Sequence, residues 1–345
     1  MSKNHKDIVM IRTYNSEATL GPTVDRVFSL MPEAHVIIAD DGSNDTTQNI
    51  MGTLDRIHPG QVHNFFYPHR GVSATLKSML LGTVGLIKNS TAKTIACFSC
   101  DSDDFLEPGV LDASQRIQRG ADLCFLPFQH QPGYVHKYTQ PSFYNWVPEY
   151  LSQRIQCFDN IPILKQRKVM EHMAMGYPFK TFSGTLLTKY TEGVVHYFPD
   201  NAHIGEDIPS VLCPLYKDAL ITGTTMQGYT YIKRSGSATD TSTTEKRKKE
   251  IEDKTFFAQL PLKVYHFRPE LFSVVAPTAL ARYQQRHEGV LKTRMSDDPY
   301  LLEYAKETWA HGLKAQLSVV ASQKRKRVAS ATFSYQPGMR LGYGN

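Results

Sequence analysis

Hydrophobic and polar positions alternate along roughly the first 130 residues in a way that predicts strands and helices in turn. Short apolar runs bounded by turn residues predict buried β-strands. Between them, leucine, methionine and valine residues spaced by three and four positions predict amphipathic helices. The predicted strands cover residues 7–13, 34–39, 62–67, 94–99 and 121–126, and the predicted helices cover residues 22–30, 72–87 and 108–119.

Polar side chains follow three of these predicted strands at the point where each strand ends. They lie in residues 13–15, 40–45 and 101–104. Strands that alternate with helices form a mostly parallel sheet with helices on both faces. Ligands of such α/β folds bind at the carboxyl ends of the strands. The pattern therefore predicts an α/β fold with a binding site at this edge of the sheet.

The rest of the chain has a less regular pattern. Residues 127–160 show no period and are rich in Pro, Gln, Tyr and His, which predicts a long loop or lid. We divide the chain into a catalytic domain at 1–240 and a mainly helical extension at 241–345. Further predicted elements are helices at 162–175, 245–257 and 299–322, a helix after Gly205-Glu206-Asp207, a strand at 182–188 and two short strands within 219–233.

The positive charge of the chain is concentrated in the predicted extension. Residues 1–240 carry 21 Lys and Arg against 23 Asp and Glu, whereas residues 241–345 carry 18 against 10. A basic module beside a nearly neutral one favours an anionic partner, although a solvated surface has the same composition. The five cysteines are scattered, and no apolar run has the ~18 residues of a membrane span. We therefore expect reduced thiols and a cytoplasmic protein without a transmembrane segment.

Asp101 and Asp103 flank Ser102 on a turn that follows the predicted strand at 94–99. Two carboxylates at this spacing can converge on one divalent cation, because Mg²⁺ and Mn²⁺ prefer oxygen ligands. Such an ion can act as the Lewis acid that neutralises a departing diphosphate. The alternative is an Asp-rich turn that caps the helix near Pro108.

Asp40 and Asp41 end the second predicted strand. A fixed carboxylate beside a metal turn can accept the imide N–H of a uracil. The alternative is a helix N-cap, in which Ser43 and Asp45 bind free backbone N–H groups. Both interpretations can hold for different residues of the same turn.

Six motifs follow one another from about residue 7 to residue 240. They are residues 11–15, 37–45, 71–74, 101–104 with Pro108 and Gly109, 205–207 and 231–237. In this order and spacing the chain resembles the family 2 glycosyltransferases, which are inverting enzymes of the GT-A fold. The resemblance implies a mixed, mostly parallel sheet flanked by helices, and the transfer of a sugar from a nucleotide-sugar donor.

The same resemblance implies a UDP-sugar donor and Mn²⁺ or Mg²⁺ as cofactor. The residues that it implies for uridine binding are Thr13, Tyr14, Asp40 and Asp41. Asp101 would contact the donor ribose or the metal, and Asp103 would bind the metal.

Asp207 is the implied catalytic base, which would deprotonate the acceptor hydroxyl before an in-line attack on the anomeric carbon. Lys233, Arg234 and Ser237 are the residues implied for diphosphate binding.

The sequence departs from the family pattern in three respects. Where the family often continues as Ala-Arg-Asn, this chain has Thr75, Leu76 and Lys77. Where the family often supplies a metal-binding His, Arg234 stands here, and His266 is a substitute to consider. The region after residue 240 matches no pattern of the family.

Two other classes of protein share some of these features. A sugar-1-phosphate nucleotidyltransferase would need a Gly-rich basic loop after the first strand, where this chain has residues 13–17. A non-catalytic nucleic-acid-binding module would account for the basic extension and leave the acidic clusters without a purpose.

The acceptor of the transfer is open. A glycan or a lipid-linked glycan leads, reached through a peripheral membrane contact of residues 299–322 with Trp309 and the basic run 324–327. The alternative acceptor is a hydroxylated base in duplex DNA, as in phage-type DNA glycosylation, with the extension binding phosphates. The cytoplasm would then be that of a bacterium or of a phage-infected host.

Overall fold

The computed structural model of the 345-residue chain describes residues 4–131, 141–157, 160–162, 165, 169, 180–195, 219–232 and 248. The chain divides into two compact units, Met1–Asp253 and Lys254–Asn345, and every described residue belongs to the first. The predicted domain boundary at residue 240 stays a prediction. None of the helices within the described ranges is long and apolar enough to cross a membrane.

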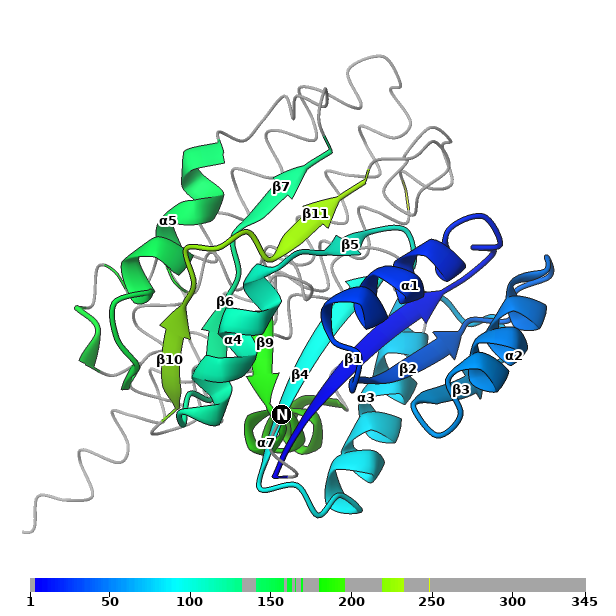
Figure 1. Ribbon diagram of the computed structural model, residues 1–345, viewed down its shortest axis with the longest axis horizontal. Coiled ribbons are helices and arrows are strands. Elements are labelled where there is room, and N and C mark those ends of the chain that lie inside the picture. Colours follow the sequence, from blue (N-terminus) through cyan, green and yellow to red (C-terminus); the bar gives the residue numbers. More distant parts are fainter. Residues whose placement is uncertain are drawn as a thin grey trace, which may run out of the picture. The chain divides into compact units, whose positions relative to one another are not determined.

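The main sheet has eight strands in the order β3-β2-β1-β4-β9-β6-β10-β8 (Figure 1). β3, β2, β1 and β4 run parallel, and β9 pairs antiparallel with both β4 and β6. The strands are β1 (His5–Thr13), β2 (His35–Asp40), β3 (Val62–Phe66), β4 (Thr94–Asp101), β6 (Leu123–Phe125), β8 (Gln156–Cys157), β9 (Lys180–Ser183) and β10 (Leu220–Gly223).

Helices cover both faces of this sheet, as expected for strands joined by helical crossovers. α1, α2 and α4 pack on one face, and α3 and α7 pack on the other (Figure 1). The helices are α1 (Leu20–Leu30), α2 (Thr47–Ile57), α3 (Val72–Lys88), α4 (Gly109–Gln118), α5 (Pro141–Leu151) and α7 (Gly184–Val194).

A second, three-stranded sheet lies beyond the end of β4. It consists of β5 (Phe105–Leu106), β11 (Tyr229–Tyr231) and β7 (Phe128–His130), with β11 in the middle. β5 follows the 101–104 turn directly, so this sheet connects that turn to the late strand β11.

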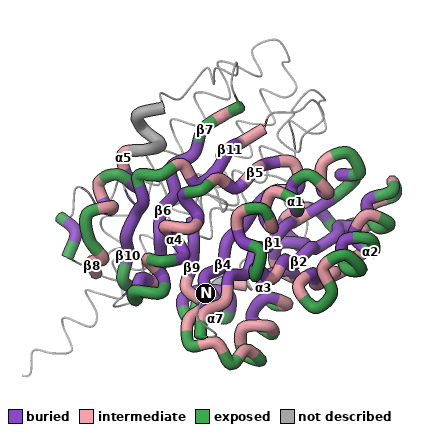
Figure 2. Tube along the Cα trace, viewed as in Figure 1, coloured by how far each residue is buried: buried purple, intermediate pink, exposed green. Residues whose placement is uncertain are grey.

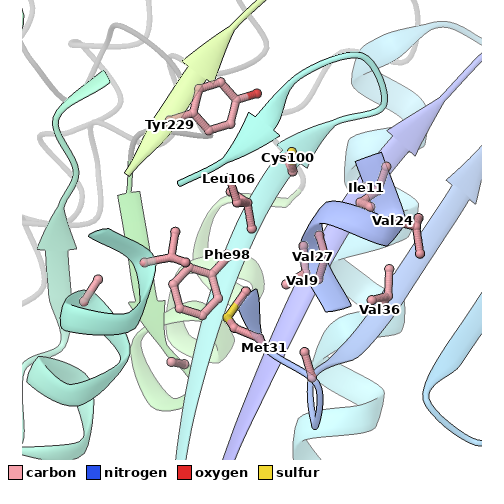
Figure 3. Packing of buried hydrophobic residues seen from close by; sticks show 14 of the residues in the cluster. Val9, Ile11, Val24, Val27, Met31, Val36, Phe98, Cys100, Leu106 and Tyr229 are labelled. Atoms are coloured by element: carbon pink, nitrogen blue, oxygen red, sulfur yellow. The ribbon is translucent and has the colours of Figure 1, made fainter. Parts of the chain in front are cut away.

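The central strands are buried on both faces, which explains their nearly continuous apolar sequences (Figure 2). Val9 and Ile11 of β1 pack in a cluster with residues of α1, α2 and α4, among them Val24 and Val27 (Figure 3). Tyr229 of β11 belongs to the same cluster, and its hydroxyl accepts a hydrogen bond from Asp101 N–H at the end of β4. The apolar core therefore fixes the positions at which β1, β2 and β4 end.

The five strands and three helices predicted before residue 127 are confirmed, with ends that differ by at most a few residues. The fold is therefore α/β with a large, mostly parallel sheet. The two short strands predicted within 219–233 are also confirmed as β10 and β11.

Two predictions after residue 126 were wrong. The strand predicted at 182–188 ends at Ser183, whose side chain accepts a hydrogen bond from Leu186 N–H and so begins helix α7. The loop predicted at 127–160 contains β7, α5 and β8. The helix predicted at 162–175 and those after residue 200 lie mostly or wholly outside the described residues.

Candidate active site

The three polar clusters predicted to form a site do meet at one edge of the sheet. In the parallel register, Thr13 of β1 pairs with Asp40 of β2, and Arg12 pairs with Asp101 of β4. The backbone N–H of Asp41 donates to Thr13 O at 3.0 Å, which continues the β1–β2 pairing past the end of β2. Because these strands are adjacent and parallel, their carboxyl ends bring the predicted residues into one row (Figure 1).

Arg12 contacts the first carboxylate of the 101–104 turn. Its Nη2 donates to Asp101 Oδ1 at 2.7 Å, and the guanidinium is largely buried while Asp101 is about one-third exposed. A charge-assisted hydrogen bond of this kind fixes the orientation of a carboxylate more strongly than a neutral one. The position of Asp101 is therefore set by the neighbouring strand.

The turn itself is held from α1 and the loop that precedes it. Thr23 Oγ1 donates to Ser102 O at 3.1 Å and to Asp104 O at 3.2 Å. The hydroxyls of Ser16 and Ser102 are 2.8 Å apart and both are buried. Asp103 lies in this braced turn and is half-buried.

Asp104 is directed into the protein instead of toward the edge. Its carboxylate accepts hydrogen bonds from Ile232 N–H at 2.7 Å and from the buried hydroxyl of Tyr229. Burial, together with the charges of Asp101 and Asp103, raises the pKa of Asp104 to about 8. Asp104 therefore ties the acidic turn to β11.

Asp40 is fully buried within the turn that follows β2. Its oxygens accept hydrogen bonds from the N–H and hydroxyl of Ser43 and, at 2.7 Å, from Gln48 Nε2. Asp45 Oδ1 accepts from Thr47 N–H at 2.9 Å, close to the start of α2. Asp45 thus binds a free backbone N–H group at the start of α2, as predicted, whereas Ser43 Oγ accepts from Asn15 N–H at 2.8 Å outside the helix. The predicted contact of Asp40 with uridine stays a prediction.

Asp41 is directed toward the first turn of α3. Its Oδ1 accepts from Arg70 N–H at 3.0 Å and from Thr75 Oγ1 at 2.7 Å, and its Oδ2 accepts from Gly71 N–H at 3.0 Å. His69 Nδ1 lies 2.9 Å from the same Oδ2. A carboxylate at a helix N-terminus satisfies free backbone N–H groups and opposes the helix dipole.

Tyr14 and Thr13 complete the described part of the site. Tyr14 is 43% exposed, and its ring stacks on the ring of His69 with centroids 4.4 Å apart. Thr13 is buried, and its hydroxyl has no hydrogen-bond partner among the residues that the structure describes. Buried hydroxyls are rarely left without a partner, so this group is suited to contact a ligand at the edge.

The remaining predicted site residues lie outside the described residues. They are Asp207, Lys233, Arg234, Ser237 and His266. Sequence reasoning missed Arg12, His69, Thr75 and Tyr229. A charged residue inside a buried strand pattern could have drawn attention to Arg12, and Thr75 was noted only as a departure from the family motif.

The carboxylates of Asp101 and Asp103 have the oxygen chemistry that Mn²⁺ or Mg²⁺ requires. Within the described part of the chain, no three His, Cys, Asp or Glu side chains form a group that could hold a metal ion. Arg12 already engages Oδ1 of Asp101 through its 2.7 Å hydrogen bond.

Comparison with known families and structures identifies the class of protein. Residues 8–170 match the family described as glycosyl transferase family 2. This part of the chain therefore matches glycosyl transferase family 2, and the match supports a glycosyltransferase. Among curated proteins, none matches the chain.

Solved structures of low sequence identity also match this chain. S. aureus TarS 1–349 in complex with UDP-GlcNAc is 18% identical, with a TM-score of 0.51, and the match covers 93% of this chain and 92% of that one. The mannosyltransferase PcManGT from Pyrobaculum calidifontis, in complex with GDP-Man and Mn²⁺, is 12% identical, with a TM-score of 0.50 and coverage of 94% and 80%. At these identities the likeness establishes the GT-A type fold alone, which confirms the fold expected from the sequence.

Proposed function

We propose that this protein transfers a sugar from a UDP-sugar to an acceptor hydroxyl, with inversion at the anomeric carbon. The observation that carries the proposal is the row formed by Thr13, Tyr14, Asp41 and the 101–104 turn at the carboxyl ends of β1, β2 and β4. The complexes of TarS with UDP-GlcNAc and with UDP support a uridine nucleotide as donor.

The base of the donor would bind between Tyr14 and Asp41. The exposed ring of Tyr14 offers a stacking surface. Asp41 Oδ2 would accept the imide N–H of uracil, and the hydroxyl of Thr13 would supply a further hydrogen bond. Guanine also carries a ring N–H, so binding to Asp41 distinguishes uracil and guanine from cytosine.

Asp101 and Asp103 would hold a divalent cation and the donor ribose at the diphosphate end. When bound, Mn²⁺ or Mg²⁺ would act as a Lewis acid that offsets the negative charge of the leaving diphosphate. The Mn²⁺ in the PcManGT complex supports this assignment. Lys233, Arg234 and Ser237 are proposed to bind the diphosphate oxygens.

Asp207 is proposed as the general base. A carboxylate takes the proton from the acceptor hydroxyl while the oxygen attacks the anomeric carbon in line with the departing diphosphate. The C–O bond to the acceptor forms as the bond to the diphosphate breaks, so one displacement inverts the configuration.

The test of this function is a donor panel. UDP-, GDP- and CDP-sugars are incubated with the protein, with and without Mn²⁺, and release of the nucleoside diphosphate is measured. The proposal expects release from a UDP-sugar, dependence on the divalent cation and loss in Asp207→Asn. Release from CDP-sugars at the same rate would contradict the role of Asp41.

For the acceptor, we propose a glycan or lipid-linked glycan, with the basic residues 241–345 in contact with an anionic membrane surface. The net charge of +8 in this segment also suits DNA, so a hydroxylated base in duplex DNA is the second candidate. Titration with duplex DNA and with anionic liposomes at several salt concentrations separates the two. DNA binding that weakens steeply with salt, without binding to liposomes, would favour the DNA acceptor.

The proposed site of action is the cytoplasm of a bacterium or of a phage-infected host. The cysteines in the described ranges, Cys97, Cys100, Cys124 and Cys157, are free thiols, and the first three are buried. Burial raises the pKa of Cys97, Cys100 and Cys124 far above the usual thiol range, so these groups are unreactive.

A further inference from the structure

His69 has two partners in the structure, and both are residues assigned above to the donor base. Its ring stacks on Tyr14 with a centroid distance of 4.4 Å and an interplanar angle of 20°. Its Nδ1 lies 3.1 Å from the backbone O of Asp41, to which it is hydrogen-bonded, and 2.9 Å from Asp41 Oδ2. One imidazole therefore makes the aromatic contact and the carboxylate contact that a uracil ring would make.

The four groups around the Asp41 carboxylate differ in how readily they can leave. Arg70 N–H and Gly71 N–H belong to the two residues before α3, and Thr75 Oγ1 belongs to its first turn. The two backbone N–H groups cannot move without displacing the start of the helix, and the side chain of Thr75 is buried. His69 contributes a side chain that is about half exposed, and it can rotate away without disturbing the backbone. A carboxylate has about four acceptor positions, and three of them are taken by Arg70 N–H, Gly71 N–H and Thr75 Oγ1. The remaining position lies beside His69 Nδ1, so an incoming N–H would displace this side chain.

The backbone of His69 is held in place by the conformation of the turn after β2. Gly42 has a φ of +74°, and a Cβ at this position would lie 2.6 Å from His69 N. The glycine thus allows the 67–69 segment to approach the end of β2 closely. Since the backbone is fixed, the imidazole remains near Tyr14 and Asp41 whenever it is not displaced.

We propose that His69 occupies the base subsite as an internal competitor of the donor nucleotide. The proposal rests on the proposed function, because it takes the uridine contacts of Tyr14 and Asp41 as given. At 4.4 Å the two rings are in direct contact, so a base reaches this face of Tyr14 only when the imidazole leaves it. The nucleotide must therefore break two contacts of His69 before it forms its own, and His69 lowers the affinity for the donor.

The test is the dissociation constant for UDP, measured by calorimetry on the 345-residue chain in the presence of Mn²⁺. His69→Ala should bind UDP about 5-fold more tightly than the wild type, the equivalent of roughly 1 kcal/mol for the lost competing contacts. His69→Phe keeps an aromatic ring but lacks the imidazole N–H, so its affinity for UDP should fall between those of the wild type and of His69→Ala. His58→Ala is the matched control. His58 follows the last residue of α2, and its ring stacks on Phe28 of α1 with a centroid distance of 3.8 Å, away from the proposed base subsite.

A second measurement follows the side chain itself. The imidazole signals of His69, assigned by comparison with the spectrum of His69→Ala, should move to those of an unbonded histidine when UDP saturates the protein. Unchanged signals at saturation, or equal or weaker UDP binding by His69→Ala, would overturn this proposal alone. Failure of the wild-type protein to bind UDP would overturn the proposed function and this proposal with it.

Discussion

Arg12 and Asp101 are register neighbours on adjacent parallel strands, and their side chains are joined by a 2.7 Å hydrogen bond between Nη2 and Oδ1. The pair connects the central strand of the sheet to the acidic turn. Asp101 Oδ1 is therefore engaged by a side chain of the neighbouring strand. The first acidic residue of the turn is thus oriented by β1 and not by the turn alone.

Replacement of Arg12 by Met should loosen Asp101 and reduce kcat/KM for the donor by roughly 10-fold or more, because a charge-assisted hydrogen bond is lost at the site. Steady-state kinetics with varied UDP-sugar measure this effect. Arg26→Met is the control, since Arg26 makes a similar 2.7 Å pair with Glu107 on the far side of the turn. Equal losses in the two variants would mean that Arg12 has only a general structural role.

Asp103→Asn should lower the transfer rate by roughly 100-fold or more, the order of magnitude for loss of one electrostatic stabilising group. Asp103 is half-buried in a braced turn, so the fold should persist. The measurement is UDP release together with a thermal unfolding scan, with the exposed Asp55→Asn on α2 as control. A variant that keeps near wild-type activity would remove Asp103 from the site.

Thr75→Val should destabilise the protein by about 1.5–3 kcal/mol, the range for a hydrogen bond to a charged group. The Thr75 hydroxyl is buried and donates to Asp41 at 2.7 Å, and Val has a similar shape without the donor. Urea unfolding measures the change. Thr53→Val, which removes an exposed hydroxyl that bonds to Asn49 O, should have little effect. If both variants unfold alike, Asp41 does not depend on Thr75.

Acid should destabilise the β2–β3 edge of the sheet. His35 Nδ1 lies 3.0 Å from His63 Nε2, and burial with the charges of Lys6 and His63 lowers the pKa of His35 from 6.5 to about 4. Between these pH values the unfolded chain binds a proton at His35 that the folded chain does not. The contribution of neutral His35 to the free energy of unfolding is therefore complete above pH ~6.5 and is lost as the pH falls toward 4. His35→Gln should reduce this decline in urea midpoints measured from pH 7 to pH 4.5. An identical decline in the variant would show that other groups cause it.

The sequence predicted the α/β core because its strands are buried on both faces and therefore read as apolar runs, as in residues 7–13. It also placed the acidic clusters at the ends of those strands, since parallel register brings their carboxyl ends together. The strand predicted at 182–188 was wrong because β9 passes directly into helix α7 at Ser183. No turn residues stand between the two elements to mark the boundary.

The detailed contacts of the site could not be predicted in the same way. The roles of His69 and Thr75 depend on the point at which α3 begins relative to Asp41, which is a distance between segments about 30 residues apart. Tyr229 reaches the acidic turn from β11, more than a hundred residues away. No local spacing carries that information, because tertiary packing sets it.

The central claim is that Asp41 receives a ring N–H of the donor base at the end of β2. The most direct test compares the dissociation constants of UDP and CDP for the wild-type protein under identical conditions with Mn²⁺. Uracil has an N–H at ring position 3 and cytosine does not, so the account predicts binding of UDP at least about 10-fold tighter than that of CDP. Equal affinities, or no binding of either nucleotide, would contradict it.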